Sequence, residues 1–234
     1  MKTPDIQLYT ASTMNGWKPL IFLHEADVEY ELIPVDFDRK EQKRPEYLAL
    51  NPNGRIPTIV DRGNDDFVVF ESGAILWYLA EKYGRFLPSA QKQRSETLQW
   101  IMFQMGGVGP MMGQAMYFQR IARPNGHEVP FAITRYIDES RRLLEVLDRR
   151  LAEREFLVGD DYTIADMATY PYARSYPWAN VSVDGLVHLQ RWFATIDRRE
   201  KTQAALQRPE PRPAAFGHGD IEAAARINAA RYKD

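Results

Sequence analysis

The sequence predicts two consecutive folding units, a mixed α/β half followed by an all-helical half. Between residues 5 and 86, short apolar segments of strand length alternate with helical patterns. Beyond residue 90 no further strand pattern is found, and long segments with helical periodicity take over. With 234 residues, of which 44% are hydrophobic, the chain has enough apolar material for one large domain or two modest ones.

The α/β half is expected to form a small mixed sheet with the element order βαβ-α-ββα. The turn RGNDD at 62–66 holds glycine, asparagine and aspartate between two apolar segments, which predicts a hairpin and an antiparallel pair of strands. The predicted strands are 5–9, 29–35, 57–61 and 67–70, and the predicted helices are 15–26, 45–50 and 71–84.

The second half is expected to be helical throughout. TIAD at 163–166 has the form of an N-terminal capping box and predicts where one helix begins. The stretch MFQMGGVGPMMGQAM carries glycines and a proline, which predict a kink in the first helix. The predicted helices lie near 91–122, 127–153, 163–177, 186–198 and 219–232. The expected domains are 1–87 and 93–234, with a tail from about residue 207.

The composition of the chain excludes several classes of function. A formal net charge of −2 gives no global field that would attract nucleic acid or an acidic membrane. The apolar runs are too short to span a bilayer and no basic segment with an apolar stretch opens the chain, so we expect a cytoplasmic protein. With no cysteine and four scattered histidines, we expect no disulfide, no cysteine nucleophile and no metal site.

The turn ASTMNGWKP, between the first strand and the first helix, is the first candidate site. Thr13 and Asn15 lie where the helix begins, and Gly16 relieves crowding there. Both side chains are suited to capping the helix. Alternatively, hydroxyl, amide and backbone N–H donors at a helix N-terminus would stabilise a thiolate that belongs to a ligand.

Two further segments of the α/β half are candidates. In NGRIPTIV, a cis Ile56-Pro57 bond would turn the Ile56 backbone outward to pair with an extended peptide, although a trans bond is the commoner form. In FESGAI, Ser72 is a natural N-cap, and the free N–H groups of the first turn suit a carboxylate. The simpler interpretation is that Ser72 only caps its helix and Glu71 is solvated.

The ordered set LYTASTMNG, NPNGRIP, FESGAILWYLAEKYG and FLVGDDYTIADMATYPY resembles the cytosolic glutathione transferase superfamily over residues 5 to about 206. The resemblance implies a thioredoxin-like domain followed by a helical-bundle domain, glutathione as cosubstrate and a homodimer. T-x-N-G, ESGAI, LQWIMFQMGGVGPMMGQ and PFAITRY further resemble the bacterial Nu class of disulfide-bond oxidoreductases, which is related to the fungal prion-type nitrogen regulator. In that class a Thr and an Asn replace the usual catalytic residue, although Met14 here stands where proline is expected between them.

The resemblance also implies roles for individual residues. Thr13 and Asn15 would be the catalytic pair beside the glutathione sulfur, with the Ser12 hydroxyl as an alternative of the serine type. The residues that would bind the rest of glutathione are Gln42, Arg55, Ile56, Glu71, Ser72 and Arg135. The residues that would line a permissive pocket for the second substrate are Met111, Gln114, Tyr117, Tyr172 and Trp178.

Three functions follow from this reading. The leading one is a glutathione-dependent reductase that acts on a small disulfide. The second keeps the bound thiolate and changes the electrophile, giving conjugation, dehalogenation or aryl-ether cleavage. The third, of another class, is a regulatory protein that binds glutathione without turnover.

Overall fold

The computed structural model describes residues 3–210. It contains one four-stranded sheet with the strand order β2-β1-β3-β4. The sheet is mixed, because β1 pairs with β2 in parallel and with β3 antiparallel, and β3 pairs with β4 antiparallel. The strands are β1 (Ile6–Thr10), β2 (Tyr30–Pro34), β3 (Thr58–Asp61) and β4 (Phe67–Phe70). The predicted strands and hairpin are therefore confirmed, with ends that shift by one residue.

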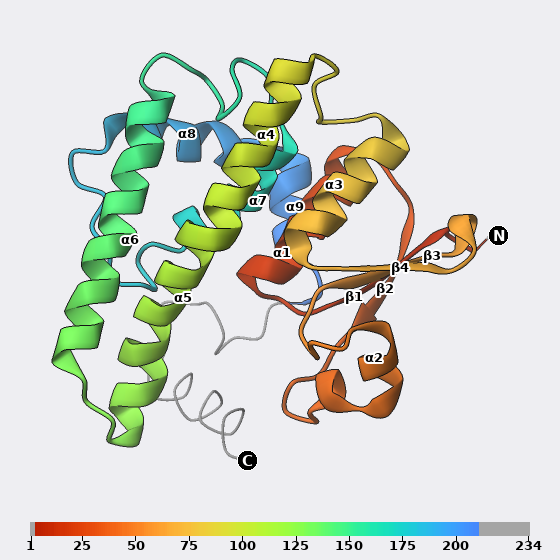
Figure 1. Ribbon diagram of the computed structural model, residues 1–234, viewed down its shortest axis with the longest axis horizontal. Coiled ribbons are helices and arrows are strands. Elements are labelled where there is room, and N and C mark those ends of the chain that lie inside the picture. The colour runs from red at the N-terminus through yellow and green to blue at the C-terminus, as the bar shows by residue number, and fades with distance from the viewer. Residues whose placement is uncertain (1–2, 211–234) are drawn as a thin grey trace.

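Three α-helices accompany the sheet. Figure 1 shows α2 on the opposite side of the sheet from α1 and α3. The apolar residues of α1, from Leu20 to Leu23, are fully buried, and they join Ile6, Leu8 and Ile59 of the sheet in the core. The helices are α1 (Met14–Glu25), α2 (Pro45–Leu50) and α3 (Ser72–Tyr83). The N-terminal domain is thus thioredoxin-like, as the sequence predicted.

The helical domain is built around two long antiparallel rods that lie side by side in Figure 1. One rod contains α4 and α5, and the other is α6. The remaining helices pack behind them and reach the first domain, because α1 contacts both α7 and α9. The helices are α4 (Gln91–Phe103), α5 (Gly109–Tyr117), α6 (Pro130–Leu151), α7 (Ile164–Arg174), α8 (Val187–Asp197) and α9 (Glu200–Leu206).

The predicted kink in the first long helix takes the form of a π-helical turn, η3 (Gln104–Val108), between α4 and α5. A second π-helical turn, η4 (Phe118–Ala122), follows α5. Pro110 is the second residue of α5, directly after this π-helical turn, and as a proline it has no N–H to donate. The rod therefore bends where glycine and proline make continuous α-helix unfavourable.

The capping box at the start of α7 is confirmed. Thr163 accepts a hydrogen bond from the helix backbone, and Asp166 accepts one from the Thr163 backbone N–H at 3.0 Å. Helix α9 was not predicted, and the predicted helix 219–232 lies outside the described residues. Within residues 3–210, no helix is long and apolar enough to cross a membrane.

Candidate functional site

The opening turn places Thr13 as the N-cap of α1. Its backbone is extended (φ −146°, ψ 162°), and its Oγ1 accepts a hydrogen bond of 3.1 Å from the Gly16 N–H. A Cβ at Gly16 would lie 2.0 Å from the Ala11 carbonyl oxygen, so only glycine fits there. A hydroxyl that accepts one hydrogen bond still has a proton to donate. Thr13 therefore caps its helix and can also serve a ligand.

Asn15 is the second residue of α1 and is held by hydrogen bonds to two hydroxyl groups. Its Nδ2 donates to the Tyr172 hydroxyl at 3.2 Å, and its Oδ1 accepts from Ser72 Oγ at 3.5 Å. Tyr172 belongs to α7 and Ser72 to α3, so three helices meet at this amide. Ser12 is also buried, and within the described chain its hydroxyl has no hydrogen-bond partner.

The backbone before β3 is held by two side chains. Tyr47 Oη and Asn51 Nδ2 donate to the Arg55 carbonyl oxygen at 2.6 and 2.7 Å. The Ile56-Pro57 peptide bond is cis, whereas the frequency of X–Pro isomers favoured trans. Arg55 is exposed, and Ile56 is half-buried.

The start of α3 corrects the predicted role of Ser72. The N-cap is Glu71, and Ser72 is the first helical residue. Glu71 is exposed and has a positive φ of 70°, a conformation that is unusual for a residue other than glycine and that is concentrated at functional sites. Ser72 is buried, and its hydroxyl accepts a hydrogen bond of 3.1 Å from Lys18 Nζ instead of capping the helix.

A cavity of about 340 Å³ opens beside the first turn of α1. Five predicted glutathione-binding or catalytic residues, Arg55 among them, line it together with Lys43 and an aromatic ring. The Gln42 Oε1 is buried without a hydrogen-bond partner in the described chain. The residues that line this smaller cavity are Thr13, Asn15, Phe37, Gln42, Lys43, Gly54, Arg55 and Ile56. Amide groups, a hydroxyl and two cations are suited to a peptide that carries carboxylates.

A second cavity, of about 550 Å³, shares Asn15 and Arg55 with the first. Of the residues predicted for a second-substrate pocket, Gln114, Tyr117 and Tyr172 line it. The full lining of this larger cavity is Asn15, Lys18, Arg55, Gln104, Met105, Gly109, Pro110, Gly113, Gln114, Tyr117 and Tyr172. Its wall is more polar than the apolar pocket that the sequence suggested.

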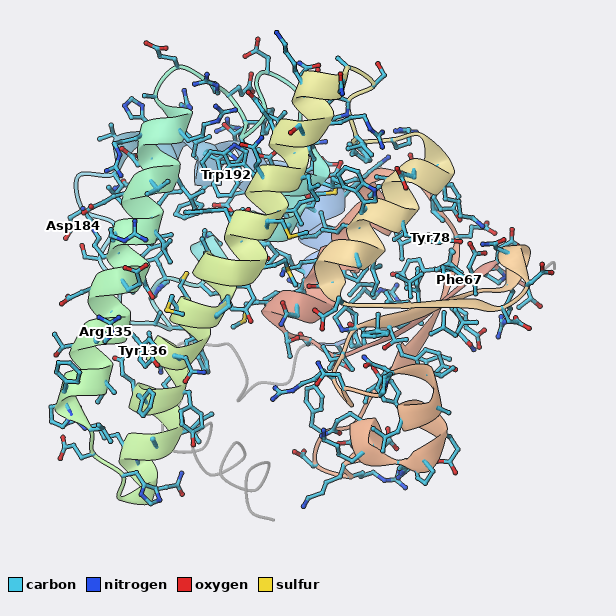
Figure 2. The ribbon with its side chains drawn as sticks, in the orientation of Figure 1. Phe67, Tyr78, Arg135, Tyr136, Asp184 and Trp192 are labelled. Carbon is cyan, nitrogen blue, oxygen red and sulfur yellow. The ribbon has the colours of Figure 1, made fainter. Side chains whose placement is uncertain are left out.

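Five predicted residues lie outside the linings of both cavities. Met111 packs against the core, and the Trp178 ring stacks with the Arg120 guanidinium 4.4 Å from its centroid. Arg135 is exposed on α6, as Figure 2 shows, and its charge contributes to the lowered pKa of Glu139, although the larger cause there is the Glu139–Arg142 hydrogen bond. Neither Glu71 nor Ser72 is a lining residue either, but Ser72 reaches the site through Asn15.

Sequence reasoning missed Lys18. This lysine is fully buried in α1, lines the larger cavity and donates hydrogen bonds to Ser72, Gln104 and Met105. Burial lowers the pKa of its ammonium to about 7, and the Glu71 carboxylate opposes that shift. One signal was available, because Lys18 follows Asn15 by three residues and so shares its face of the helix.

The described part of the chain contains no cluster of side chains that could bind a metal ion. No group of three histidine, aspartate or glutamate side chains in residues 3–210 could hold a metal ion. The polar groups around the two cavities are instead amides, hydroxyls, lysines and an arginine, which bind anions and peptides.

A thioredoxin-like domain with a helical domain packed on it is the cytosolic glutathione transferase fold. The N-terminal domain of glutathione S-transferases matches residues 4–81, and the C-terminal domain of the same enzymes matches residues 135–200. The chain therefore belongs to the glutathione S-transferase family, and the resemblance seen in the sequence is confirmed.

The chain is similar to named relatives over most of its length. It is 42% identical over 205 residues to the disulfide-bond oxidoreductase YfcG of Escherichia coli (strain K12), covering 86% of this chain and 94% of that protein. A glutathione transferase from Burkholderia graminis, solved with two glutathione molecules per subunit, has a TM-score of 0.83 at 40% identity, covering 89% of this chain and 90% of that one. A glutathione transferase from Pseudomonas putida, solved with one glutathione disulfide per subunit, has a TM-score of 0.83 at 41% identity, covering 88% and 92%.

Proposed function

We propose that the protein is a glutathione-dependent disulfide-bond reductase whose thiolate belongs to bound glutathione. That thiolate attacks one sulfur of a small disulfide, the S–S bond breaks, a mixed disulfide forms, and the departing thiolate takes a proton from solvent. The thiolate of a second glutathione then attacks the glutathionyl sulfur, giving glutathione disulfide and the second thiol. Both electrons come from glutathione, which suits a chain without cysteine.

The observation that carries this proposal is that Asn15 and Arg55 line both cavities. A reaction between two bound molecules is fastest when their reacting atoms meet at a shared wall. In our assignment one glutathione occupies the smaller cavity with its sulfur at Thr13 and Asn15. The disulfide, and later the second glutathione, enters the larger cavity from the other side of Asn15.

Each binding residue has a proposed partner on glutathione. The Ile56 backbone pairs with the cysteinyl unit as an added strand would, and Gln42 and Arg55 bind the glycyl end. Glu71 and Ser72 hold the γ-glutamyl end at the start of α3. Arg135 on α6 is assigned to an outer carboxylate of the second molecule.

The lining of the larger cavity favours a peptide disulfide over an aromatic electrophile. Lys18 and Arg55 supply positive charge, and Gln104 and Gln114 supply amide groups. Cations and amides are suited to the carboxylates and peptide groups of a second glutathionyl unit. The two glutathiones of the Burkholderia graminis protein and the disulfide of the Pseudomonas putida protein support this choice.

Conjugation to a small electrophile is the second candidate. The observation in its favour is that Met105, Pro110, Tyr117 and Tyr172 are among the residues that line the larger cavity, and they offer contacts to an apolar ring. A third possibility, of another class, is a protein that binds glutathione without turnover. The same experiment separates all three.

Turnover is measured with glutathione and either a small hydroxyalkyl disulfide or an activated halonitrobenzene, while calorimetry measures glutathione binding. The proposal expects faster turnover of the disulfide. Faster turnover of the halonitrobenzene would favour conjugation, and binding without either reaction would favour the regulatory role. Thr13→Ala and Asn15→Ala are expected to raise the pKa of the bound thiol and to slow disulfide reduction. If neither variant changes either quantity, the assigned sulfur site is wrong.

We also propose a homodimer that forms through β4 and α4. Strand β4 is at the edge of the sheet, where Phe67 and Phe70 are 50% and 38% exposed, and Leu98 and Met102 of α4 are 40% and 58% exposed. Exposed apolar side chains of this size mark interaction surfaces. Sedimentation equilibrium is expected to give twice the chain mass, and Phe67→Glu with Met102→Glu to give the monomer. A monomeric wild type would contradict this assignment.

A further inference from the structure

Lys18 is a lysine in the interior of the protein, which is rare for an ionisable side chain. Its side chain has no exposed surface although it lies in α1 beside the two cavities. Removing an ammonium from water is costly, and the cost remains when no carboxylate pairs with it. The contacts of the Lys18 ammonium indicate what role this buried charge has.

The three hydrogen bonds of the ammonium all go to uncharged acceptors. Ser72 Oγ lies at 3.1 Å, Gln104 Oε1 at 2.9 Å and Met105 Sδ at 3.5 Å. The ring of Tyr172 lies below the same nitrogen, 5.3 Å away at its centroid. The positive charge is therefore held in place without being neutralised by a direct partner.

These bonds set the direction of the Asn15 amide. An ammonium only donates hydrogen bonds, so the Ser72 oxygen must accept from Lys18 and turn its own O–H elsewhere. The neighbouring acceptors for that proton are Asn15 Oδ1 at 3.5 Å and Met105 Sδ at 3.7 Å. With Oδ1 facing Ser72, the Asn15 NH₂ group donates to the Tyr172 hydroxyl, and both residues line the larger cavity.

We propose that Lys18 is a positioning residue of this site, a buried cation that orients the Asn15 amide through Ser72 and favours the thiolate form of the bound glutathione sulfur. This inference rests on the proposed function, because it takes the sulfur to lie beside Asn15. Lys18 does not exchange a proton with the substrate in this proposal. It acts through its fixed charge and through the hydrogen bonds that it donates.

The charged and titratable groups around Lys18 come from several elements. Glu71, before α3, favours the charged form of the lysine, and burial opposes it. Arg55, Tyr117 and Tyr172 line the same cavity. Of these, the exposed Arg55 adds positive charge on the ligand side, so a ligand thiolate between the two cations would favour the protonated form of Lys18 in return.

The test compares Lys18→Met with Lys18→Arg in the full chain. Methionine removes the charge and the hydrogen bonds, whereas arginine retains a cation and its donors. Lys92→Met is the matched control, because it removes an exposed lysine of α4. The main readout is the pKa of the thiol in the saturated glutathione complex, followed by the ultraviolet absorbance of the thiolate. The accompanying readouts are kcat and KM for the small disulfide and the free energy of unfolding.

We expect Lys18→Met to raise the bound thiol pKa by roughly 1–3 units, the usual effect of losing a nearby opposite charge. At a pH below that pKa, kcat is expected to fall about tenfold for each unit, because the thiolate fraction falls by that factor. Lys18→Arg is expected to retain a low thiol pKa, and Lys92→Met to behave as the wild type. Ser72→Ala keeps the charge of Lys18 and loses the hydrogen bonds that connect Lys18 to Asn15. The pKa of the bound glutathione thiol is therefore expected to rise by less in this variant than in Lys18→Met.

An unchanged thiol pKa in folded Lys18→Met that still binds glutathione would overturn the inference and leave the proposed function standing. If Lys18→Met does not fold, a wild-type thiol pKa in Lys18→Arg together with a modest rise in Ser72→Ala would support the inference. A raised value in Lys18→Arg, or an unchanged value in Ser72→Ala, would overturn it. If the wild type itself binds no glutathione, the proposed function fails first, and this inference fails with it.

Discussion

The guanidinium of Arg199 binds the carboxylate of Glu25 through two hydrogen bonds of 2.9 and 2.7 Å. Glu25 ends α1 of the thioredoxin-like domain, and Arg199 precedes α9 of the helical domain. Thr202 Oγ1 donates to the same carboxylate at 2.7 Å, and the guanidinium lies 4.2 Å from the ring centroid of Tyr162. This buried carboxylate therefore connects the two domains whose packing forms the larger cavity.

Arg199→Met is expected to lower the free energy of unfolding by about 2–3 kcal/mol, because it leaves the Glu25 carboxylate buried without its cation. The effect is below that of a fully buried pair, since the Arg199 side chain is 32% exposed. Urea unfolding measures it. Arg198→Met, at the exposed neighbouring residue, is the control and should change stability little. A loss in Arg199→Met no larger than in this control would show that the pair contributes no stability.

Asp166 is expected to be the most sensitive polar residue of the helical domain. Its carboxylate accepts hydrogen bonds from the Leu157 and Thr163 backbone N–H groups and from Trp192 Nε1, each at 3.0 Å. Asp166→Ala leaves these buried donors unsatisfied, so a loss of about 3–5 kcal/mol is expected. Thr163→Ala removes the cap and the hydroxyl's hydrogen bond to Asp166 but leaves the Asp166 carboxylate with its other donors, and it is expected to cost about 1–2 kcal/mol. Thermal and urea unfolding of both variants measure these losses of stability. Equal losses in the two variants would contradict the expected order.

Lys18 is expected to make the stability of the ligand-free protein depend on pH. Its pKa is lowered from the ordinary 10.5 to about 7 by burial, so between these values the unfolded state binds one proton more than the folded state. Stability should therefore rise with pH from about 7 towards 10, with a slope of up to about 1.4 kcal/mol per pH unit from this group. Urea unfolding at several pH values gives the free energy of unfolding of the wild type and of Lys18→Met, and the difference between the two as a function of pH isolates this slope. A difference that is constant with pH would contradict the lowered pKa.

Two glycines near the cavities should respond in opposite directions to alanine. A Cβ at Gly16 would meet the Ala11 carbonyl at 2.0 Å and the Thr10 hydroxyl at 2.5 Å, so Gly16→Ala should cost about 2–3 kcal/mol. A Cβ at Gly113, in α5, would meet no atom within 4 Å, so Gly113→Ala should stabilise the protein by up to about 1 kcal/mol. Thermal unfolding distinguishes them. Equal effects would show that the turn before α1 relaxes readily.

Arg55 lines both cavities, so its loss should weaken the binding of both substrates. Arg55→Met is expected to raise the KM for glutathione and the KM for the disulfide by about tenfold each, the effect of losing one charge-assisted hydrogen bond. Steady-state kinetics with each substrate varied in turn measures this. Arg39→Met is the control, because Arg39 is exposed in the same domain. An effect on one KM alone would place Arg55 in a single binding site.

The regular elements were largely predictable because their signals are local. Alternation of apolar residues, the glycine-containing hairpin and the TIAD capping box act over a few residues, and the structure contains the elements predicted within residues 3–210. Helix α9 was missed because EKTQAAL is short and has no apolar stripe of its own. Its buried Thr202 contacts Glu25 of α1, so docking onto another helix stabilises it.

The candidate site was predictable only in part. The structure brings five of the predicted residues to one cavity, namely Thr13, Asn15, Gln42, Arg55 and Ile56. The predicted cap at Ser72 was wrong, because a buried lysine from another helix competes for its hydroxyl. Their chemical roles remain predictions until the variants are measured.

By itself the sequence determined the fold class, through periodicity and turn residues, and its ordered motifs carried the resemblance to the family that the domain matches then showed. Only the tertiary structure decided that Asn15 meets Tyr172, 157 residues away, and that Lys18 is buried with its ammonium over the Tyr172 ring. Strand and helix signals act between near neighbours, whereas burial and cavity walls arise from packing between distant segments. A lysine in α1 becomes an interior cation only when α3, α7 and the π-helical turn η3 close around it.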